Sequence, residues 1–292
     1  MKPLAAIIGS VANQLPAALH GGLKRSLSRR RDKSRAVEFR RAYSVDSFDH
    51  PPCAICGGLD VGFHFEFNGF RIVRCKRDGL IFVSPRPTDL TQFYDSRYYL
   101  GQLKGLYAEY SSHANSMEAE WKERLGNIES LGARRGKLLD VGAATGDFLL
   151  LARERGWSVT GLEKSEWAAQ RAVERGLCMF TGDLSTAAIP EGSFDVITMW
   201  DCIEHLSEPR ATLAAAARAL VPGGVLAIST GEVPHTDPRL RSGWYYPPWH
   251  LYYFSQETLS LLCEASGFTV ARLDVRDTDS NYGFMTMFAR RR

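Results

Sequence analysis

Short hydrophobic runs alternate with amphipathic stretches along the second half of the chain. The runs have the length of strands, and the apolar residues between them recur with helical spacing. This pattern predicts strands at residues 138–141, 158–162, 194–199, 225–229 and 283–289, and helices at residues 147–155, 165–175, 209–220 and 256–266. Such alternation is typical of an α/β domain, in which helices cover both faces of a parallel sheet.

The first half of the chain lacks this alternation and divides into three regions. Residues 1–45 form an apolar and then basic leader. Residues 46–85 hold three of the six cysteines between short strand-like runs, and residues 86–130 form a tyrosine-rich linker with helical spacing. The α/β domain then occupies residues 131–292. No apolar run approaches the ~20 residues that are needed to cross a bilayer.

Basic residues are concentrated in the leader. The formal net charge of the chain is +3, but residues 24–41 contain nine basic residues and two acidic ones, a net charge of +7. The remainder is slightly acidic and offers no basic face, so we expect no nucleic-acid partner. The leader suits peripheral contact with an anionic membrane, and a disordered tail is the alternative. Without a signal-peptide pattern, we expect a cytoplasmic, membrane-peripheral protein.

A loop of small residues joins the first strand of the α/β domain to its first helix. The sequence Leu-Asp-Val-Gly-Ala-Ala-Thr-Gly-Asp places Asp140, Gly142 and Gly146 in the spacing Asp-x-Gly-x-x-x-Gly. Glycines allow a ligand to approach the backbone closely, and the helix that follows offers free N–H groups. A nicotinamide-binding turn has the spacing Gly-x-Gly-x-x-Gly. Asp140 instead suits a ligand with a cationic amino-acid end.

Acidic residues also follow the next two strands. Glu163 ends the second strand, where a carboxylate can accept both hydroxyl groups of a ribose, and Asp183 follows the third. Each acid alone could be a solvated loop charge or a helix cap. Acids at three successive strand ends indicate one ligand, because open α/β sheets bind ligands at those ends. Further expected cofactor contacts are Ala144, Leu184 and Trp200.

These motifs resemble the class I methyltransferases that depend on S-adenosylmethionine (SAM), and most of all the branch that includes the ubiquinone-type O-methyltransferases. The similar stretches are residues 139–146, 194–197, 201–206, 220–224 and 265–268. The resemblance implies a Rossmann-like, seven-stranded α/β sheet, SAM as the cofactor and methyl transfer as the activity. Ala144 replaces a glycine that is usual in this family, and its methyl group can be accommodated if φ is negative.

The stretch at residues 201–206 supplies candidate catalytic groups. Asp201, Glu204 and His205 follow the fourth strand, and the resemblance implies that this edge borders the methyl group. Such a set is suited to a divalent cation, for example Mg²⁺, that polarises a hydroxyl group. The alternative is that Glu204 and His205 only cap and pack the following helix.

A second histidine lies in an aromatic stretch after the fifth strand. The segment from His250 to Ser255 is similar to the base-bearing segment of sugar C-methyltransferases with a zinc-binding N-terminal module. Trp249 stands where those enzymes have glutamate. We favour His250 as a general base over a structural histidine under an aromatic lid. The predicted substrate contacts are Tyr94, Tyr98, Trp244 and Trp249.

The cysteine-containing region resembles a zinc ribbon in which one ligand is changed. Cys53 and Cys56 form one half, and Cys75 begins the other, where Asp78 occupies the place of a fourth cysteine. A structural zinc ion held by three thiolates and Asp78 is one explanation. Zinc with His50 or His64 recruited, and a metal-free remnant, are the others.

The combined motifs predict O-methylation of a small-molecule or lipid-linked metabolite. C-methylation of a nucleotide-linked sugar and a SAM-fold scaffold without turnover are the alternatives. The acids at the strand ends argue against a loss of cofactor binding.

Overall fold

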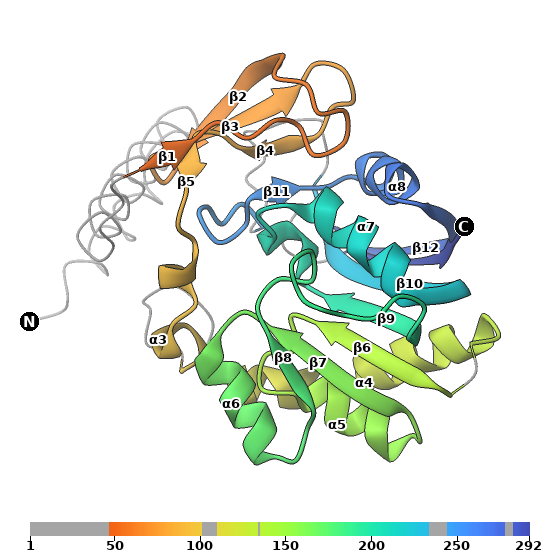
Figure 1. The fold of residues 1–292 in the computed structure, drawn as a ribbon. Helices are drawn as coiled ribbons and strands as arrows, with labels where there is room; N and C mark the ends of the chain where they lie inside the picture. Colours follow the sequence, from red (N-terminus) through yellow and green to blue (C-terminus); the bar gives the residue numbers. More distant parts are fainter. Residues whose placement is uncertain (1–46, 101–109, 134, 234–243, 278–282) are drawn as a thin grey trace, which may run out of the picture.

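A seven-stranded sheet passes through the second half of the molecule in the order β12-β13-β10-β9-β6-β7-β8 (Figure 1). The computed structural model describes residues 47–100, 110–133, 135–233, 244–277 and 283–292. Strand β13 runs antiparallel to both of its neighbours, and the remaining neighbours pair in parallel. The predicted Rossmann-like sheet is confirmed. Its strands are β6 (Lys137–Val141), β7 (Ser158–Glu163), β8 (Met179–Thr181), β9 (Phe194–Trp200), β10 (Leu220–Glu232), β12 (Phe268–Asp277) and β13 (Gly283–Arg291).

Neighbouring residues of the central strands point to opposite faces of this sheet, as the period of two requires. Leu138 and Val196 pack in a hydrophobic cluster with α4 and α5. Leu139 and Ile197 pack in a second cluster with α7 and α8. The sheet is therefore the middle layer of three. The helices are α4 (Tyr110–Ser130), α5 (Asp147–Glu154), α6 (Glu166–Glu174), α7 (Pro209–Ala219) and α8 (Gln256–Ala265).

The N-terminal module is built on a small antiparallel sheet in the order β11-β4-β3-β2. Strand β11 comes from the far end of the chain and begins two positions after His250, so the region at 46–85 does not complete this sheet by itself. A short ribbon of β1 and β5 lies beside it. The strands are β1 (Phe48–Asp49), β2 (Val61–Phe67), β3 (Phe70–Cys75), β4 (Ile81–Val83), β5 (Arg86–Pro87) and β11 (Tyr252–Tyr253).

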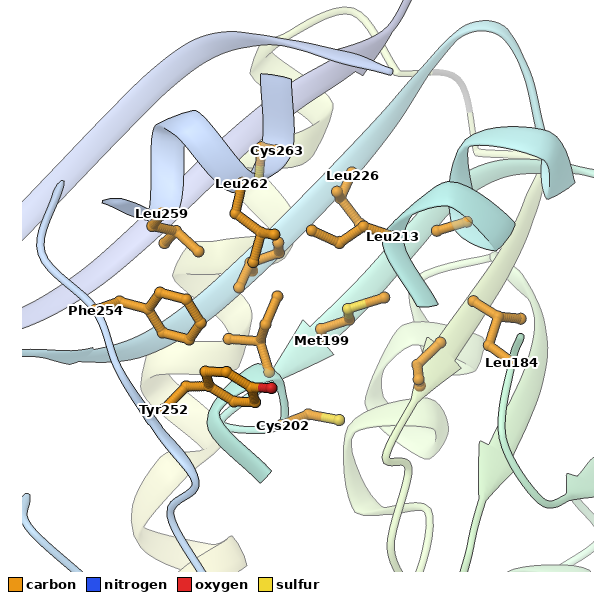
Figure 2. Close-up of a cluster of buried hydrophobic side chains, with 14 of the residues drawn as sticks. Leu184, Met199, Cys202, Leu213, Leu226, Tyr252, Phe254, Leu259, Leu262 and Cys263 are labelled. Carbon is orange, nitrogen blue, oxygen red and sulfur yellow. The ribbon is translucent and has the colours of Figure 1, made fainter. Parts of the chain in front are cut away.

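The module and the α/β domain share one hydrophobic core. Leu80 and Phe82 of the module belong to the same buried cluster as Met199 of β9 and Leu259 of α8. Figure 2 shows Phe254 near Leu259 of α8, and Tyr252 on the side of Cys202, both within this cluster. The first part of the linker lies between the two units and forms the short helices η1 (Thr91–Phe93) and α3 (Ser96–Tyr99).

The basic leader, for which we predict membrane contact, lies outside the described residues. Within the part of the chain that the structure describes, no helix combines the length and the apolar character that a bilayer span requires.

Candidate active site

A cavity of about 510 Å³ lies at the carboxyl ends of the parallel strands. Val141 at the end of β6, Leu162 in β7 and Trp200 at the end of β9 line it. From β6 the chain winds outward through β7 and β8, and from β9 it winds in the opposite direction through β10. The cavity therefore occupies the switch point at which open α/β sheets bind ligands.

One half of the cavity is lined by Gly142, Ala144, Glu163 and Asp183, which are predicted cofactor contacts, and is called the cofactor half. Glu163 is its central acid. Its carboxylate accepts hydrogen bonds from the backbone N–H groups of Ala144 at 2.9 Å and Ser165 at 2.8 Å, and from the Tyr99 hydroxyl at 3.2 Å. Burial raises the pKa of Glu163, and these hydrogen bonds act in the opposite direction. The carboxylate is thus held in place on the cavity wall.

The loop after β6 approaches the cavity through Gly142 and Ala144. Gly142 has φ +78°, and an added Cβ would lie 2.7 Å from the Cys202 Sγ atom, so only glycine fits. The expectation of a negative φ at Ala144 is wrong, because φ is +47°. The left-handed conformation costs an alanine about 1–2 kcal/mol. It also aims the Ala144 N–H group at Glu163, which explains why the conformation is retained.

The other predicted cofactor residues divide into two groups. Asp183, Leu184 and Trp200 line the cavity, whereas Asp140 and Gly146 are not among its lining residues. Gly146 instead caps α5 with φ +83°, where an added Cβ would lie 2.2 Å from Leu177 Cδ1. Its role is local packing of the loop.

Asp140 is buried behind the cavity wall, where the Thr198 hydroxyl donates a hydrogen bond of 2.6 Å to its carboxyl group. Burial raises the pKa of Asp140 to about 7, and the nearby Glu163 carboxylate contributes in the same direction. Any effect of Asp140 on a ligand therefore passes through the loop that it supports or through its charge.

Glu204 occupies the other half of the cavity with a fully buried side chain. One carboxyl oxygen accepts a hydrogen bond of 3.0 Å from the Thr230 hydroxyl, while the other, Oε1, has no hydrogen-bond partner among the described residues. Burial, reinforced by Asp201, raises the pKa of Glu204 well above its usual value. An unpartnered buried oxygen on a cavity wall is a candidate contact for a ligand.

Two histidines face Glu204. The Nδ1 atom of His205 lies 2.8 Å from the Trp249 carbonyl oxygen, and that of His250 lies 2.7 Å from the Trp244 carbonyl oxygen. A carbonyl only accepts hydrogen bonds, so both Nδ1 atoms carry the proton and both Nε2 atoms keep a lone pair. The two rings meet edge to face with their centroids 4.8 Å apart.

Burial keeps both imidazoles neutral. It lowers the pKa of His205 to about 4, and it lowers the pKa of His250 well below the usual value, with His205 adding to the effect. Neutral imidazole is the form that accepts a proton or binds a metal ion. Ligand atoms of Glu204, His205 and His250 all lie within 4.8 Å of one another.

Asp201 does not belong to this group, although the sequence places it with Glu204 and His205. Its carboxylate instead accepts a hydrogen bond of 3.0 Å from the Ser229 hydroxyl. His250, which is 45 positions beyond His205, takes the third place. The sequence spacing could not reveal this, because β10 lies between the two histidines in the sequence. The chain returns to the Glu204–His205 turn only after β10, in the segment that leads into β11.

The predicted substrate contacts lie around the same cluster. Tyr94, Tyr98 and Trp244 line the cavity. The Tyr94 hydroxyl lies 3.0 Å from His205 Nδ1, and burial raises its pKa well above the usual value. Trp249 is not a lining residue: its indole N–H donates to the Phe93 carbonyl at 3.2 Å and ties the linker to the histidine segment.

Other residues of the cavity wall are not in our sequence predictions. Tyr99 donates to Glu163. The aromatic side chains of Trp121 and Phe284, and the ion pair of Glu120 with Arg276, also line the cavity. The tyrosine cluster of the linker was a signal for Tyr99. Glu120 and Arg276 are 156 positions apart, and no local pattern connects them.

The cysteine module brings its four predicted ligands together. Atoms of Cys53, Cys56, Cys75 and Asp78 lie within 4.8 Å of one another. The Cys53 thiol lies 3.2 Å from an Asp78 oxygen, and the sulfur atoms of Cys56 and Cys75 are 3.6 Å apart. Three sulfur atoms and a carboxylate form a donor set that suits tetrahedral zinc. His50 and His64 are not in this group.

Comparison with known proteins identifies the domain that carries this cavity. The family described as "Methyltransferase domain" matches residues 110–273, which is more than half of the chain. The chain belongs to this family.

Curated relatives of the methyltransferase domain include two proteins named ubiquinone biosynthesis O-methyltransferase. The protein of Idiomarina loihiensis is 34% identical over 37% of this chain and 48% of its own length. The protein of Nitrosococcus oceani is 35% identical over the same shares. The chain therefore spans about half the length of the curated relatives that it matches.

Solved structures show the same fold at low sequence identity. The PH0226 protein of Pyrococcus horikoshii is 19% identical, with a TM-score of 0.52 over 67% of this chain and 97% of its own. A phosphoethanolamine N-methyltransferase of Haemonchus contortus in complex with SAM is 18% identical, with a TM-score of 0.51 over 59% of this chain and 52% of its own. At these identities the likeness concerns the fold alone.

Proposed function

We propose that this protein transfers the methyl group of SAM to a hydroxyl group of a small-molecule or lipid-linked acceptor. The observation that carries the proposal is the composition of a single cavity. One half has strand-end acids beside a close backbone approach, and the other half has a carboxyl group near two neutral imidazoles.

The residues of the cofactor half fit SAM. Glu163 can accept hydrogen bonds from the ribose, and Asp183 stands at the end of the next strand for the adenine amino group. Gly142 keeps the loop free of side-chain atoms. When bound, SAM supplies an electrophilic methyl group on a sulfonium. The protein then has to align the acceptor, take its proton and exclude water.

His250 is our candidate for the group that takes the proton. Its Nδ1–H is fixed on the Trp244 carbonyl, so the backbone sets the orientation of the ring and Nε2 keeps its lone pair. A ligand atom of its ring lies within 4.8 Å of those of Glu204 and His205. The side chain is 5% exposed, which keeps competing water away. Glu204, His205 and His250 together could also hold a divalent cation such as Mg²⁺, which would polarise an acceptor hydroxyl.

The charge of the cavity favours an acceptor without phosphate groups. Among the described lining residues, five are acids and two are the cations Lys164 and Arg276. Lys164 is paired with Asp183, and Arg276 is paired with Glu120. A nucleotide-linked sugar would bring further negative charge into this cavity. We therefore place O-methylation of an uncharged acceptor before C-methylation of a nucleotide sugar.

A transfer assay with labelled SAM tests the proposed function. The purified protein is incubated with phenols, sugar nucleotides and lipid-linked alcohols, with and without added Mg²⁺. We expect label in an uncharged hydroxyl acceptor. Tight binding of SAM without transfer to any acceptor would favour the scaffold alternative.

We further propose that Cys53, Cys56, Cys75 and Asp78 hold a structural zinc ion, because four protein ligands leave no position for a substrate. Elemental analysis of protein prepared without chelators should find about one zinc per chain, and Cys75→Ala should abolish it. Exposed Cys178→Ala is the matched control and should keep the metal. Absence of zinc from the unaltered protein would contradict this assignment.

A further inference from the structure

Arg86 is a buried arginine at the junction between the cysteine module and the methyltransferase domain. It lies in β5 and is only 4% exposed. Its Nη1 atom donates hydrogen bonds to the Ser207 carbonyl at 2.9 Å and to the Tyr252 hydroxyl at 3.1 Å. Its other nitrogens contact Asp49 at 3.4 Å and Glu208 at 3.2 Å. The guanidinium therefore connects segments from both units.

The two acceptors of Nη1 belong to the segments that carry the candidate catalytic groups. Ser207 lies two positions after His205, just beyond the turn η2 (Ile203–His205). Tyr252 lies two positions after His250 and begins β11. The Tyr252 hydroxyl also donates to the Ser207 carbonyl at 3.3 Å, which closes a triangle with Arg86. A buried fork of this kind fixes the relative position of both segments.

Backbone hydrogen bonds add a second link between the module and the same two segments. The Val83 N–H group of β4 donates to the Leu251 carbonyl at 2.8 Å, and the Leu251 N–H group donates to the Glu204 carbonyl at 2.8 Å. Figure 1 shows β11 beneath β4, at the base of the module. The residue after His250 is thus held by the module on one side and by Glu204 on the other.

We infer that Arg86 is a positioning residue, through which the cysteine module sets the placement of the Glu204–His205 turn against His250. The inference rests on the proposed function, because the groups that it aligns are the candidate catalytic groups. The module is then a part of the active-site framework, and the Arg86 side chain acts on turnover without reaching the cavity.

Arg210 provides a matched control for this inference. It also joins the two units, since its Nη1 atom donates to the Ile55 carbonyl at 2.8 Å from α7. Among the described residues its side chain hydrogen-bonds to Ile55, and not to Ser207, Tyr252 or Leu251. A change at Arg210 weakens the junction and leaves the triangle around Arg86 intact.

The test compares Arg86→Met, Arg86→Lys and Arg210→Met for turnover, SAM affinity and thermal stability. We expect Arg86→Met to lower kcat by up to about 10²-fold, the cost of a misplacement of about 1 Å, with an unchanged Kd for SAM. Arg86→Lys keeps the positive charge but lacks the planar guanidinium, so its kcat should lie between that of Arg86→Met and that of the unaltered protein. Arg210→Met should retain kcat. Equal losses in Arg86→Met and Arg210→Met, or a fall in SAM affinity that matches the fall in kcat, would overturn the inference.

Hydrogen exchange gives a readout that does not depend on activity. In Arg86→Met the Leu251 and His205 amides should lose protection, while the amides of β6 keep theirs. If Arg86→Met does not fold, Tyr252→Phe keeps the ring in the core and removes one corner of the triangle, with the same expected loss of protection. Unchanged exchange at Leu251 in the folded variants would overturn the inference. If the unaltered protein transfers no methyl group, the proposed function fails, and the exchange result still tests the positioning role.

Discussion

The two halves of the cavity are built in different ways. The cofactor half takes its residues from successive strand ends of one sheet, so Gly142, Glu163 and Asp183 follow one another within 42 positions. The catalytic half combines a turn after β9, a segment before β11 and the linker from the other end of the chain. The first half is positioned by the sheet itself. The second half is positioned by contacts between distant segments, and we expect it to be the more sensitive to changes at the junction.

The largest expected effect concerns His250. His250→Ala should lower turnover by about 10²–10⁴-fold, the usual contribution of a positioned acid–base group, while SAM affinity remains. Steady-state kinetics and calorimetry measure the two quantities. Unaltered turnover in His250→Ala would contradict the assignment of His250 as the base, and unaltered turnover in both His250→Ala and His205→Ala would show that the enzyme works by proximity alone.

Variants of His205 and Glu204 distinguish a mechanism with His250 as the base from one with a metal ion that activates the acceptor. If a cation activates the acceptor, His205→Ala and Glu204→Gln should damage turnover more than His250→Ala, and added Mg²⁺ should raise the activity of the unaltered protein. Asp201→Asn should have the weaker effect, because Asp201 is bonded to Ser229 and lies outside the cluster. Glu232→Gln, an acid at the end of β10 that contacts Gln256, is the control and should retain activity.

Substitutions in the cofactor half should change the affinity for SAM more than the turnover. Glu163→Ala should weaken SAM binding by about 1–3 kcal/mol, the range for buried hydrogen bonds to a charged group. Asp140→Asn should weaken it less, because Asp140 is not a lining residue. Calorimetry on both variants checks the order. Equal affinity in both variants and in the unaltered protein would contradict the SAM site.

The last prediction concerns stability and needs neither cofactor nor acceptor. The pKa of Asp140 is about 7 in the folded protein and 3.8 ordinarily, so the folded state binds this proton more tightly than the unfolded chain does. The contribution of Asp140 to the free energy of unfolding is therefore highest below pH 4. It decreases as the pH rises from about 4 through about 7. Asp140→Asn removes the buried group that ionises at high pH. In thermal unfolding at pH 8 without ligand, this variant should therefore have a higher Tm than the unaltered protein. A lower Tm of the variant at pH 8 would contradict the assignment.

The contrast between the two halves also sets what could be predicted from the sequence. Most strand and helix positions in the α/β domain followed from local periodicity, as did Glu163 and Asp183 on the cavity wall. Strand β12 was not among the predicted strands, and β10 is longer than the predicted run at 225–229. The left-handed conformation of Ala144 depends on its hydrogen bond to Glu163. The buried position of Asp140 behind the cavity wall depends on its hydrogen bond with Thr198. Neither contact can be read from a local sequence pattern.

In the catalytic half the sequence identified the residues but not their grouping. His250 joins Glu204 and His205 from 45 positions away, in a segment that is held by the pairing of β11 with β4 and by the Leu251–Glu204 backbone hydrogen bond. Arg86 gave no signal in the sequence, since its importance arises from acceptors that are 121 and 166 positions away.

The most direct test of the account is the chemical fate of the methyl group. The protein is supplied with SAM labelled at the methyl carbon and with the acceptor found by screening, and the product is analysed by NMR. The account predicts a label bound to an oxygen of an uncharged acceptor, with product formation strongly reduced in His250→Ala. A label on a carbon atom of a nucleotide-linked sugar would contradict it.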